Sequence, residues 1–167
     1  MTRLVLCLTL LLPALAFARP KVSDSGGWVR GSVEIEADKA RVLEFLRDPH
    51  NISRVEGRGT KIEVRASSGC DNISAEIPTI VGAMRYVSRR CPIDGGFQDW
   101  LVSSEDFAAY EAIWNVEATA NGVELRYQVR TEPTLPVPSE LVVRQSKRAV
   151  RKLLRALREH LEEAEAS

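Results

Sequence analysis

The side chains that could do chemistry in this sequence are few and widely spaced. The chain of 167 residues has two histidines, His50 directly after a proline and His160 near the C-terminus, both among polar residues. A Ser-His-Asp or Cys-His catalytic device needs its nucleophile and base within hydrogen-bond reach, and nothing in the sequence brings such a set together. The sequence also lacks a glycine-rich phosphate loop followed by lysine. We therefore expect no catalytic residue and no cofactor.

A general acid–base pair is the remaining way in which this chain could be an enzyme. The candidates are four charged residues on expected strands, namely Glu76, Arg85, Glu111 and Arg126. General acid–base catalysis would need two such groups within reach of one substrate. Side chains alternate between the two faces of a strand, and this alternation puts most of the four on the outer face. Strand alternation therefore makes these four residues weak candidates for catalysis.

The cysteines indicate a disulfide bond rather than a metal site. Cys7 lies in an apolar N-terminal run, which leaves Cys70 and Cys91 in the rest of the chain. Two cysteines without matching histidines make a poor metal site, so we expect no metal. The residues between them are typical of strand, turn and strand, which places the two cysteines opposite each other at the open end of a hairpin. A Cys70–Cys91 disulfide would stabilise the fold by about 3 kcal/mol; two unpaired thiols are the alternative.

The N-terminal residues have the pattern of a signal peptide. A basic residue, Arg3, precedes an apolar run at residues 4–12 and an Ala-Phe-Ala cleavage motif at residues 16–18. The apolar run is too short to cross a bilayer, so an uncleaved anchor is the weaker alternative. We expect an exported protein, periplasmic or secreted. The expected division is a signal peptide at 1–18, a flexible polar leader at 19–26 and one folded domain at 27–167.

The balance of charges limits the partners of this chain. Lysine plus arginine and aspartate plus glutamate each number 23, so the formal net charge is zero. A neutral chain has no overall field that would attract nucleic acid. We expect a monomer without a nucleic-acid partner.

A long C-terminal helix at residues 138–163 is the element around which the other elements must be placed. Ser139 can cap its start, and neither glycine nor proline follows. Its apolar residues recur with helical period on one arc, which must be covered, and a sheet is the best partner. The opposite arc carries seven cations that could be solvated or could make transient contact with an anionic membrane. These are Arg144, Lys147, Arg148, Arg151, Lys152, Arg155 and Arg158.

The rest of the chain has mainly the period of β-strands. Residues 28–36 alternate as a first strand, Asp38 caps a helix that ends before Pro49, and a short helical turn follows. From Thr60 the period is close to two for about seventy residues, with a hairpin signal at Asn121-Gly122. The order is strand, one or two short helices, about six antiparallel strands and a long helix. This order predicts an α+β fold with one face of the sheet apolar.

Several segments resemble the START-like (SRPBCC) superfamily, which also holds polyketide cyclases, coenzyme Q-binding proteins and the birch-pollen allergen group. Pro78 followed by residues 85–87, then residues 110–114, 125–127 and 132–142, are similar to the strands and the closing run of its START lipid-binding branch. The resemblance covers almost all of the mature chain in element order. It implies a helix-grip fold, in which a curved antiparallel sheet of about six or seven strands wraps the C-terminal helix around an apolar cavity.

The resemblance also implies a ligand and the residues that bind it. Members of the superfamily bind lipids, sterols, quinones and similar molecules, and a minority are enzymes, so a cyclase or dehydratase acting on a polyketide-like substrate is the alternative function. Buried Tyr and Trp need polar partners, which a ligand or enclosed water would supply; the alternative is that these side chains simply fill the core. The expected ligand-binding residues are Met84, Tyr86, Trp100, Tyr110, Trp114, Tyr127, Val143 and Val150.

Overall fold

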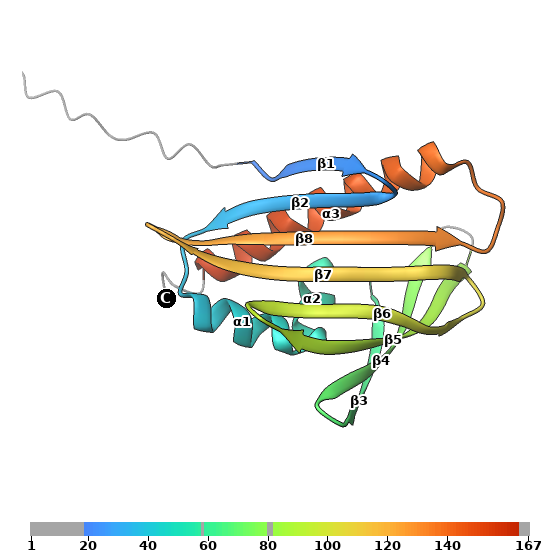
Figure 1. Cartoon of the computed structure of the whole chain (residues 1–167), viewed down its shortest axis with the longest axis horizontal. Helices are drawn as coiled ribbons and strands as arrows, with labels where there is room; N and C mark the ends of the chain where they lie inside the picture. The colour runs from blue at the N-terminus through green and yellow to red at the C-terminus, as the bar shows by residue number, and fades with distance from the viewer. Residues whose placement is uncertain (1–18, 58, 80–81, 164–167) are drawn as a thin grey trace, which may run out of the picture.

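The computed structural model describes residues 19–57, 59–79 and 82–163 of the chain (Figure 1). The expected signal peptide at residues 1–18 lies outside the described residues. The elements in chain order are β1 (Lys21–Ser25), β2 (Trp28–Ile35), α1 (Lys39–Arg47), α2 (Pro49–Glu56), β3 (Lys61–Ser67), β4 (Cys70–Thr79), β5 (Gly82–Ile93), β6 (Gly96–Ser104), β7 (Phe107–Thr119), β8 (Gly122–Pro133) and α3 (Ser139–Glu163).

The eight strands form a single antiparallel sheet in the order β1-β2-β8-β7-β6-β5-β4-β3. The long helix α3 packs on one face, against β1, β2 and β8, and the short helices α1 and α2 extend this layer (Figure 1). The α+β helix-grip architecture is therefore confirmed, with eight strands where about six or seven were expected.

The additional strand is β1, which corrects the expectation of a flexible leader at residues 19–26. It pairs with β2 from Lys21 opposite Ser32 to Ser25 opposite Trp28. Gly26 and Gly27 connect the strands, with φ of 58° and 78°. Two successive positive φ angles are what a tight hairpin turn between twisted strands requires. The glycine pair is therefore the turn of a hairpin, and the polar residues before it form an edge strand.

The core lies between α3 and the sheet. The apolar arc of the helix buries Val150, Leu153, Leu154, Leu157 and Leu161, as its helical period predicted. The helix approaches the sheet at Gly31, where a Cβ atom would lie only 2.6 Å from Leu154 Cδ1 and from Val150 Cγ1. The absence of a side chain at this position on β2 therefore sets how closely the helix packs.

Caps and cross-links fix the shorter elements where the sequence predicted them. Asp38 Oδ1 accepts hydrogen bonds from the amides of Ala40 and Arg41 at the start of α1, over 2.8 and 3.3 Å. The expected disulfide between Cys70 and Cys91 joins the start of β4 to the end region of β5. These contacts hold the outer strands and the short helices in place beside the cavity described next.

Candidate binding site

A cavity of about 210 Å³ lies between the sheet and the helices α2 and α3. Residues of α2, α3, β3, β4, β5, β6, β7 and β8 line it, so nearly every element contributes to its wall. Isoleucines from α2, β3 and β4 give one side an apolar surface: Ile52, Ile62, Ile73 and Ile77. The sheet and α3 therefore enclose a space that the side chains of the core do not fill.

Aromatic rings form the opposite wall of the cavity. Tyr86, Phe107 and Tyr110 cluster at one end, with the Tyr86 and Tyr110 ring centroids 5.0 Å apart and the Tyr86 and Phe107 rings edge to face. Trp114 stacks on Tyr127 with a centroid distance of 4.0 Å. All three tyrosines of the chain line this one cavity. Such rings offer an apolar guest flat contact surfaces together with polar edges.

Burial keeps the tyrosine hydroxyls in their neutral form. Burial, and next the negative charge of Asp99, raise the pKa of Tyr86 and Tyr127 above the ordinary value of 10. Burial also raises the pKa of Tyr110 well above that value. The hydroxyls therefore stay protonated well above neutral pH, and the Tyr86 and Tyr110 hydroxyls share a hydrogen bond.

A buried ion pair lies at the floor of the cavity. Arg90 Nε donates to Asp99 Oδ1 at 2.6 Å and Arg90 Nη2 donates to Asp99 Oδ2 at 2.8 Å. Trp114 Nε1 donates to Asp99 Oδ2 at 3.3 Å, and Arg90 Nη1 donates to the Leu46 carbonyl at 3.1 Å. The two charged side chains are 7% and 2% exposed. A bidentate, fully hydrogen-bonded geometry of this kind is what allows two charges to remain inside a core.

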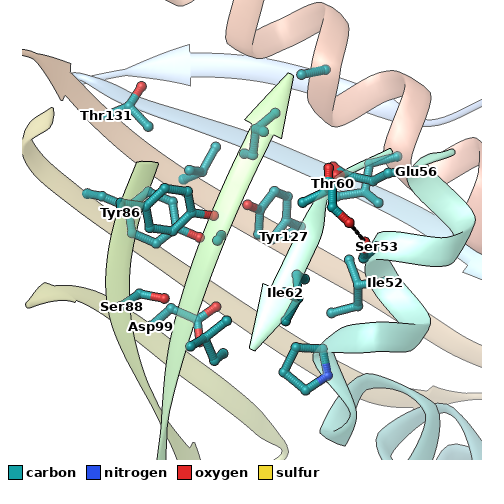
Figure 2. Close-up of a pocket in the computed structure, with 18 of the residues that line it drawn as sticks. Ile52, Ser53, Glu56, Thr60, Ile62, Tyr86, Ser88, Asp99, Tyr127 and Thr131 are labelled. Carbon is teal, nitrogen blue, oxygen red and sulfur yellow. Dashed lines mark hydrogen bonds between the residues drawn. The ribbon is translucent and has the colours of Figure 1, made fainter. Parts of the chain in front are cut away.

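Three further polar residues, Ser53, Glu56 and Thr60, lie on the side of α2, whereas Ser88 and Thr131 lie on the side of Tyr86 (Figure 2). Ser53 Oγ donates to the Thr60 carbonyl at 3.0 Å, and Glu56 lies beside them. Thr60 Oγ1 is buried at the cavity wall and has no hydrogen-bond partner among the described residues. A buried hydroxyl without a partner costs free energy, so a polar group inside the cavity would stabilise it.

The structure brings five of the expected ligand-binding residues together. Tyr86, Tyr110, Trp114, Tyr127 and Val150 all line the cavity. The Tyr86–Tyr110 cluster, the stacked Trp114 and Tyr127 rings and α3 thus surround one space.

Met84 and Val143 lie outside this lining. Met84 shares a face of β5 with Tyr86 but is half-buried opposite Ile77 of β4. Val143 packs against the edge of the core and lines a separate groove near the start of α3. Neither side chain reaches the space that the tyrosines enclose.

The expectation for Trp100 is wrong. Its side chain is 38% exposed, whereas the preceding residue, Asp99, is 1% exposed and faces the cavity. The alternation of β6 is therefore opposite in phase to the one that hydrophobicity suggested, with Phe97 and Asp99 inward. Asp99 and Arg90 are the site residues that sequence reasoning missed.

A signal for this pair does exist in the sequence. The Asp94-Gly95 turn joins β5 to β6, and residues equally distant from a hairpin turn pair with each other. Arg90 and Asp99 are such a pair, and the structure places them directly opposite. Two opposite charges at matched positions in an otherwise apolar layer would have predicted the inward ion pair.

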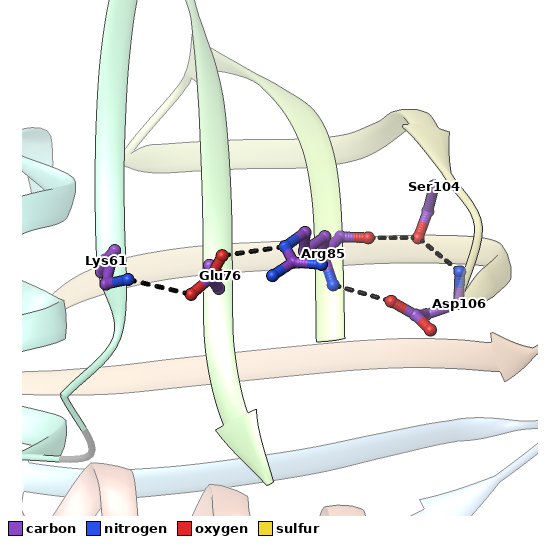
Figure 3. Close-up of polar contacts among 5 residues, drawn as sticks. All are labelled: Lys61, Glu76, Arg85, Ser104 and Asp106. Carbon is purple, nitrogen blue, oxygen red and sulfur yellow. Dashed lines mark hydrogen bonds and ion pairs between the residues drawn. The ribbon is translucent and has the colours of Figure 1, made fainter. Parts of the chain in front are cut away.

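The sheet opens beside the aromatic end of the cavity. Strands β6 and β7 pair only from Gly96 opposite Asn115 to Trp100 opposite Glu111, and beyond that point each pairs with its other neighbour. Side chains fix the separated corner, as Figure 3 shows: Ser104 Oγ donates to the Arg85 carbonyl at 2.6 Å, and the Arg85 amide donates to Asp106 Oδ2 at 2.7 Å.

An outer groove crosses β3, β4, β5 and the end of β6, next to this corner. The groove has a volume of about 680 Å³, and Tyr86 and Ala75 line both it and the inner cavity. On the outer surface Glu76 bridges Lys61 and Arg85, with N–O distances of 3.1 and 2.8 Å (Figure 3). Glu76 and Arg85 therefore point away from the cavity, as strand alternation predicted. Only the width of the sheet at Tyr86 and Ala75 separates the groove from the cavity.

The described part of the chain shows neither a metal-binding cluster nor a membrane-spanning helix. In residues 19–57, 59–79 and 82–163, no group of three or more His, Cys, Asp or Glu side chains is arranged to hold a metal ion. The helices in those ranges are all too short or too polar to cross a membrane.

Comparisons with known proteins identify the fold. No protein-family model and no curated protein sequence matches the chain. A START superfamily protein from Mycobacterium smegmatis has a similar structure, with a TM-score of 0.71 and 16% identity over 83% of this chain and 99% of that chain. A STAR-related lipid transfer protein from Xanthomonas axonopodis gives 0.64 and 18%, over 86% of this chain and 99% of the other.

A third similar structure is an enzyme. The Zhui aromatase/cyclase from Streptomyces sp. R1128 gives a TM-score of 0.68 and 14% identity, over 81% of this chain and 93% of that chain. At identities this low, the structural similarity establishes the architecture alone, and the function must be argued from the residues of this chain. The chain has the START-like helix-grip fold, a fold whose solved examples include both a lipid transfer protein and an aromatase/cyclase.

Proposed function

We propose that this chain binds, and carries as an exported protein, an amphipathic small molecule in the cavity between the sheet and α3. The observation on which the proposal depends is the combination of an apolar and aromatic space with a buried Thr60 hydroxyl that has no partner among the described residues. Ligand pockets typically combine an apolar wall with a few polar groups that fix the orientation of the guest. Lipids, sterols, quinones and similar molecules have this mixed character.

The volume of the cavity favours a compact guest. A protein cavity of about 150 Å³ accommodates benzene, so the 210 Å³ found here suits one substituted ring or a small fused ring system. A sterol or a long lipid would insert only one end, unless α3 moved away from the sheet. The guest gains about 25 cal/mol for each Å² of apolar surface that leaves water.

The polar groups on the two sides of the cavity have separate roles in this proposal. The neutral hydroxyls of Tyr86 and Tyr127 point into its middle, while Thr60 and Glu56 lie on the side of α2 (Figure 2). A guest with one hydroxyl or carbonyl substituent can therefore place that group against Thr60 and its ring against the stacked Trp114 and Tyr127. The Arg90–Asp99 pair is already satisfied by its own hydrogen bonds and would only shape the floor.

Export is supported by two independent features of the chain. The signal-peptide pattern at residues 1–18 is the first, and the Cys70–Cys91 disulfide is the second. Disulfide bonds persist in oxidising compartments and are rare in reducing ones. Protein recovered from the extracellular or periplasmic fraction, with a new N-terminus at Arg19, would support export; full-length protein retained in the reducing cytoplasm would refute it.

Native mass spectrometry of the protein purified from its own host tests whether a guest is bound. A discrete added mass that solvent extraction removes is the expected result, and consistently empty protein would count against carriage. Binding of naphthol and of naphthalene, measured by fluorescence, then tests the site itself. These probes share a fused ring that suits the cavity and differ in one hydroxyl.

A Thr60→Val variant separates the hydrogen bond from the apolar contact. One hydrogen bond contributes about 0.5–1.5 kcal/mol, so the variant should bind naphthol roughly two- to tenfold more weakly and naphthalene as well as before. Thr119→Val is the matched control, because Thr119 is exposed at the end of β7. Equal effects of the two substitutions on naphthol binding would contradict the proposed site.

A second candidate function is a cyclase or dehydratase acting on a polyketide-like substrate. It is favoured by the ionisable groups Glu56, Arg90 and Asp99 in the cavity lining. We rank it second because Asp99 already accepts three hydrogen bonds from Arg90 and Trp114. Dehydration of an aromatic polyketide analogue, detected as loss of water by mass spectrometry and abolished by Glu56→Gln, would establish it. Binding without turnover would exclude it for that substrate class.

A further inference from the structure

The exposed face of α3 concentrates positive charge on a neutral protein. Five basic residues follow one side of the helix, opposite the arc that packs on the sheet, and all five are exposed: Arg144, Arg148, Arg151, Lys152 and Arg155. They span about 16 Å at 1.5 Å per residue. From Leu141 to Arg158 the helix has no acidic residue. We refer to these five residues as the basic face.

The basic face has no counter-charge of its own. In the described part of the chain, the other two cations of this helix are paired, Lys147 with Asp24 of β1 and Arg158 with Glu162. The five residues of the basic face form no ion pair with any described residue. Glu140 precedes the first residue of the basic face, and Glu159 lies on the same arc one turn beyond Arg155, so the basic face ends there. The charge is therefore available to an external anionic surface.

One exposed apolar side chain adjoins the basic face at the start of the helix. Leu141 is 40% exposed, and at 100° per residue it lies within the arc of the basic face, seven residues before Arg148. Leu135 and Val137, in the connector just before the helix, are also exposed, but they line a groove with Val142 and Val143 on the side of the helix that faces the sheet. Large exposed apolar side chains beside a basic helical face are characteristic of helices that lie on a membrane surface.

We propose that the outer face of α3 docks on the surface of an anionic lipid bilayer, with the basic face on the headgroups and Leu141 inserted between them. The basic face supplies the charge complementarity. Leu141 supplies an apolar component that a soluble acidic partner would not require. The same helix covers the cavity with its inner face, through Ala149, Val150 and Leu153. Docking would thus place the cavity one helix diameter from the lipid surface.

Co-sedimentation with lipid vesicles tests this proposal without knowledge of the guest. The vesicles contain equal parts of phosphatidylglycerol and phosphatidylcholine, or phosphatidylcholine alone. We expect binding to the first kind and little to the second. Each basic residue near an anionic surface contributes about a fivefold change in partitioning, so the variant R148Q/R151Q/R155Q should bind on the order of 100-fold more weakly. Raised salt should reduce binding of the unmodified chain by screening.

A matched variant controls for net charge. R47Q/R54Q/R65Q removes three exposed cations from α1, α2 and β3, and should bind as the unmodified chain does. All variants carry the same N-terminal segment, so any contribution of that segment cancels in the comparison. Equal loss in both triple variants, or unchanged binding in R148Q/R151Q/R155Q, would overturn the proposal. Circular dichroism of each variant checks that its fold is intact, which exposed substitutions should preserve.

Leu141→Gln distinguishes a bilayer from a soluble polyanion. We expect this variant to bind the anionic vesicles more weakly and to bind polyglutamate as the unmodified chain does. If Leu141→Gln left vesicle binding unchanged while polyglutamate bound as tightly as vesicles, the basic face would be a site for an acidic protein and the membrane proposal would fail. The outcome is independent of whether the cavity binds a guest, so failure here leaves the carrier proposal standing.

Discussion

Replacement of Asp99 by asparagine should destabilise the protein far more than its single altered atom suggests. The substitution keeps the shape of the side chain but leaves the Arg90 guanidinium, 7% exposed, without its counter-charge. Among the described contacts of Arg90, two oxygen acceptors would remain, and both are neutral. One is the amide oxygen of the new asparagine, and the other is the Leu46 carbonyl at 3.1 Å from Arg90 Nη1. Removal of one partner from a buried pair costs about 3–5 kcal/mol. A small domain has a total stability of only about 5–15 kcal/mol, so much of it would be lost.

Two further variants make the measurement specific to burial. Glu117→Gln removes a partner of Arg126 in an ion pair whose side chains are 45% and 50% exposed, and such pairs contribute about 0–1 kcal/mol. The double variant R90M/D99L replaces both charges with apolar groups of similar size. It should lose less stability than Asp99→Asn alone, because no buried charge remains, but about 1–3 kcal/mol should persist since Trp114 Nε1 loses its acceptor.

Urea unfolding followed by tryptophan fluorescence under non-reducing conditions gives the free energies of unfolding. The urea dependence of each variant should match that of the unmodified chain, so that the differences report stability alone. A loss in Asp99→Asn no larger than in Glu117→Gln would refute the reasoning. It would mean that water reaches Arg90 in solution and that the floor of the cavity is not as closed as described.

Three further predictions follow from the fold. The three tyrosines should not ionise near pH 10 in the folded protein, because burial raises their pKa values. Their contribution to stability is therefore complete below pH 10 and falls as the pH rises above it. Tyrosinate absorbance and unfolding at alkaline pH would measure these two effects. Gly31→Ala should lower the free energy of unfolding by about 1–3 kcal/mol, because the new methyl group meets two buried side chains of α3; an unchanged urea midpoint would contradict this. Reduction of the Cys70–Cys91 disulfide, which closes a loop across a sequence separation of 21, should cost about 3 kcal/mol in the same assay, with C70S/C91S insensitive to reductant.

The elements that the sequence predicted best are those with long or chemically specific signals. The amphipathic period of α3 extends over 25 residues, and no other secondary structure explains it. The hairpin that Asn121-Gly122 predicted joins β7 to β8, with Ala120 and Asn121 as the turn and Thr119 opposite Gly122. In each case several residues agree, so an error at one position does not change the prediction.

The errors arose where a single polar residue decides the phase of a strand. In β6 the inward position is occupied by Asp99 and the outward position by Trp100, the reverse of a hydrophobic pattern. The inward carboxylate is stable because Arg90 lies opposite it on the neighbouring strand, so the phase depends on a partner nine residues away. The residues of β1 are mostly polar and exposed, so they show no hydrophobic alternation. This strand lies at the edge of the sheet and pairs only with β2, to which the Gly26-Gly27 turn connects it.

The position of Trp114 has a practical consequence for work on this protein. Its indole stacks on Tyr127 and donates to Asp99 at the cavity wall, while Trp100 is exposed and Trp28 lies under the Arg130 guanidinium at the surface. Replacement of Trp28 and Trp100 by phenylalanine would leave Trp114, in contact with the enclosed space, as the one tryptophan of the chain. Its emission wavelength and quantum yield would then report, without any attached dye, whether that space holds solvent or cargo.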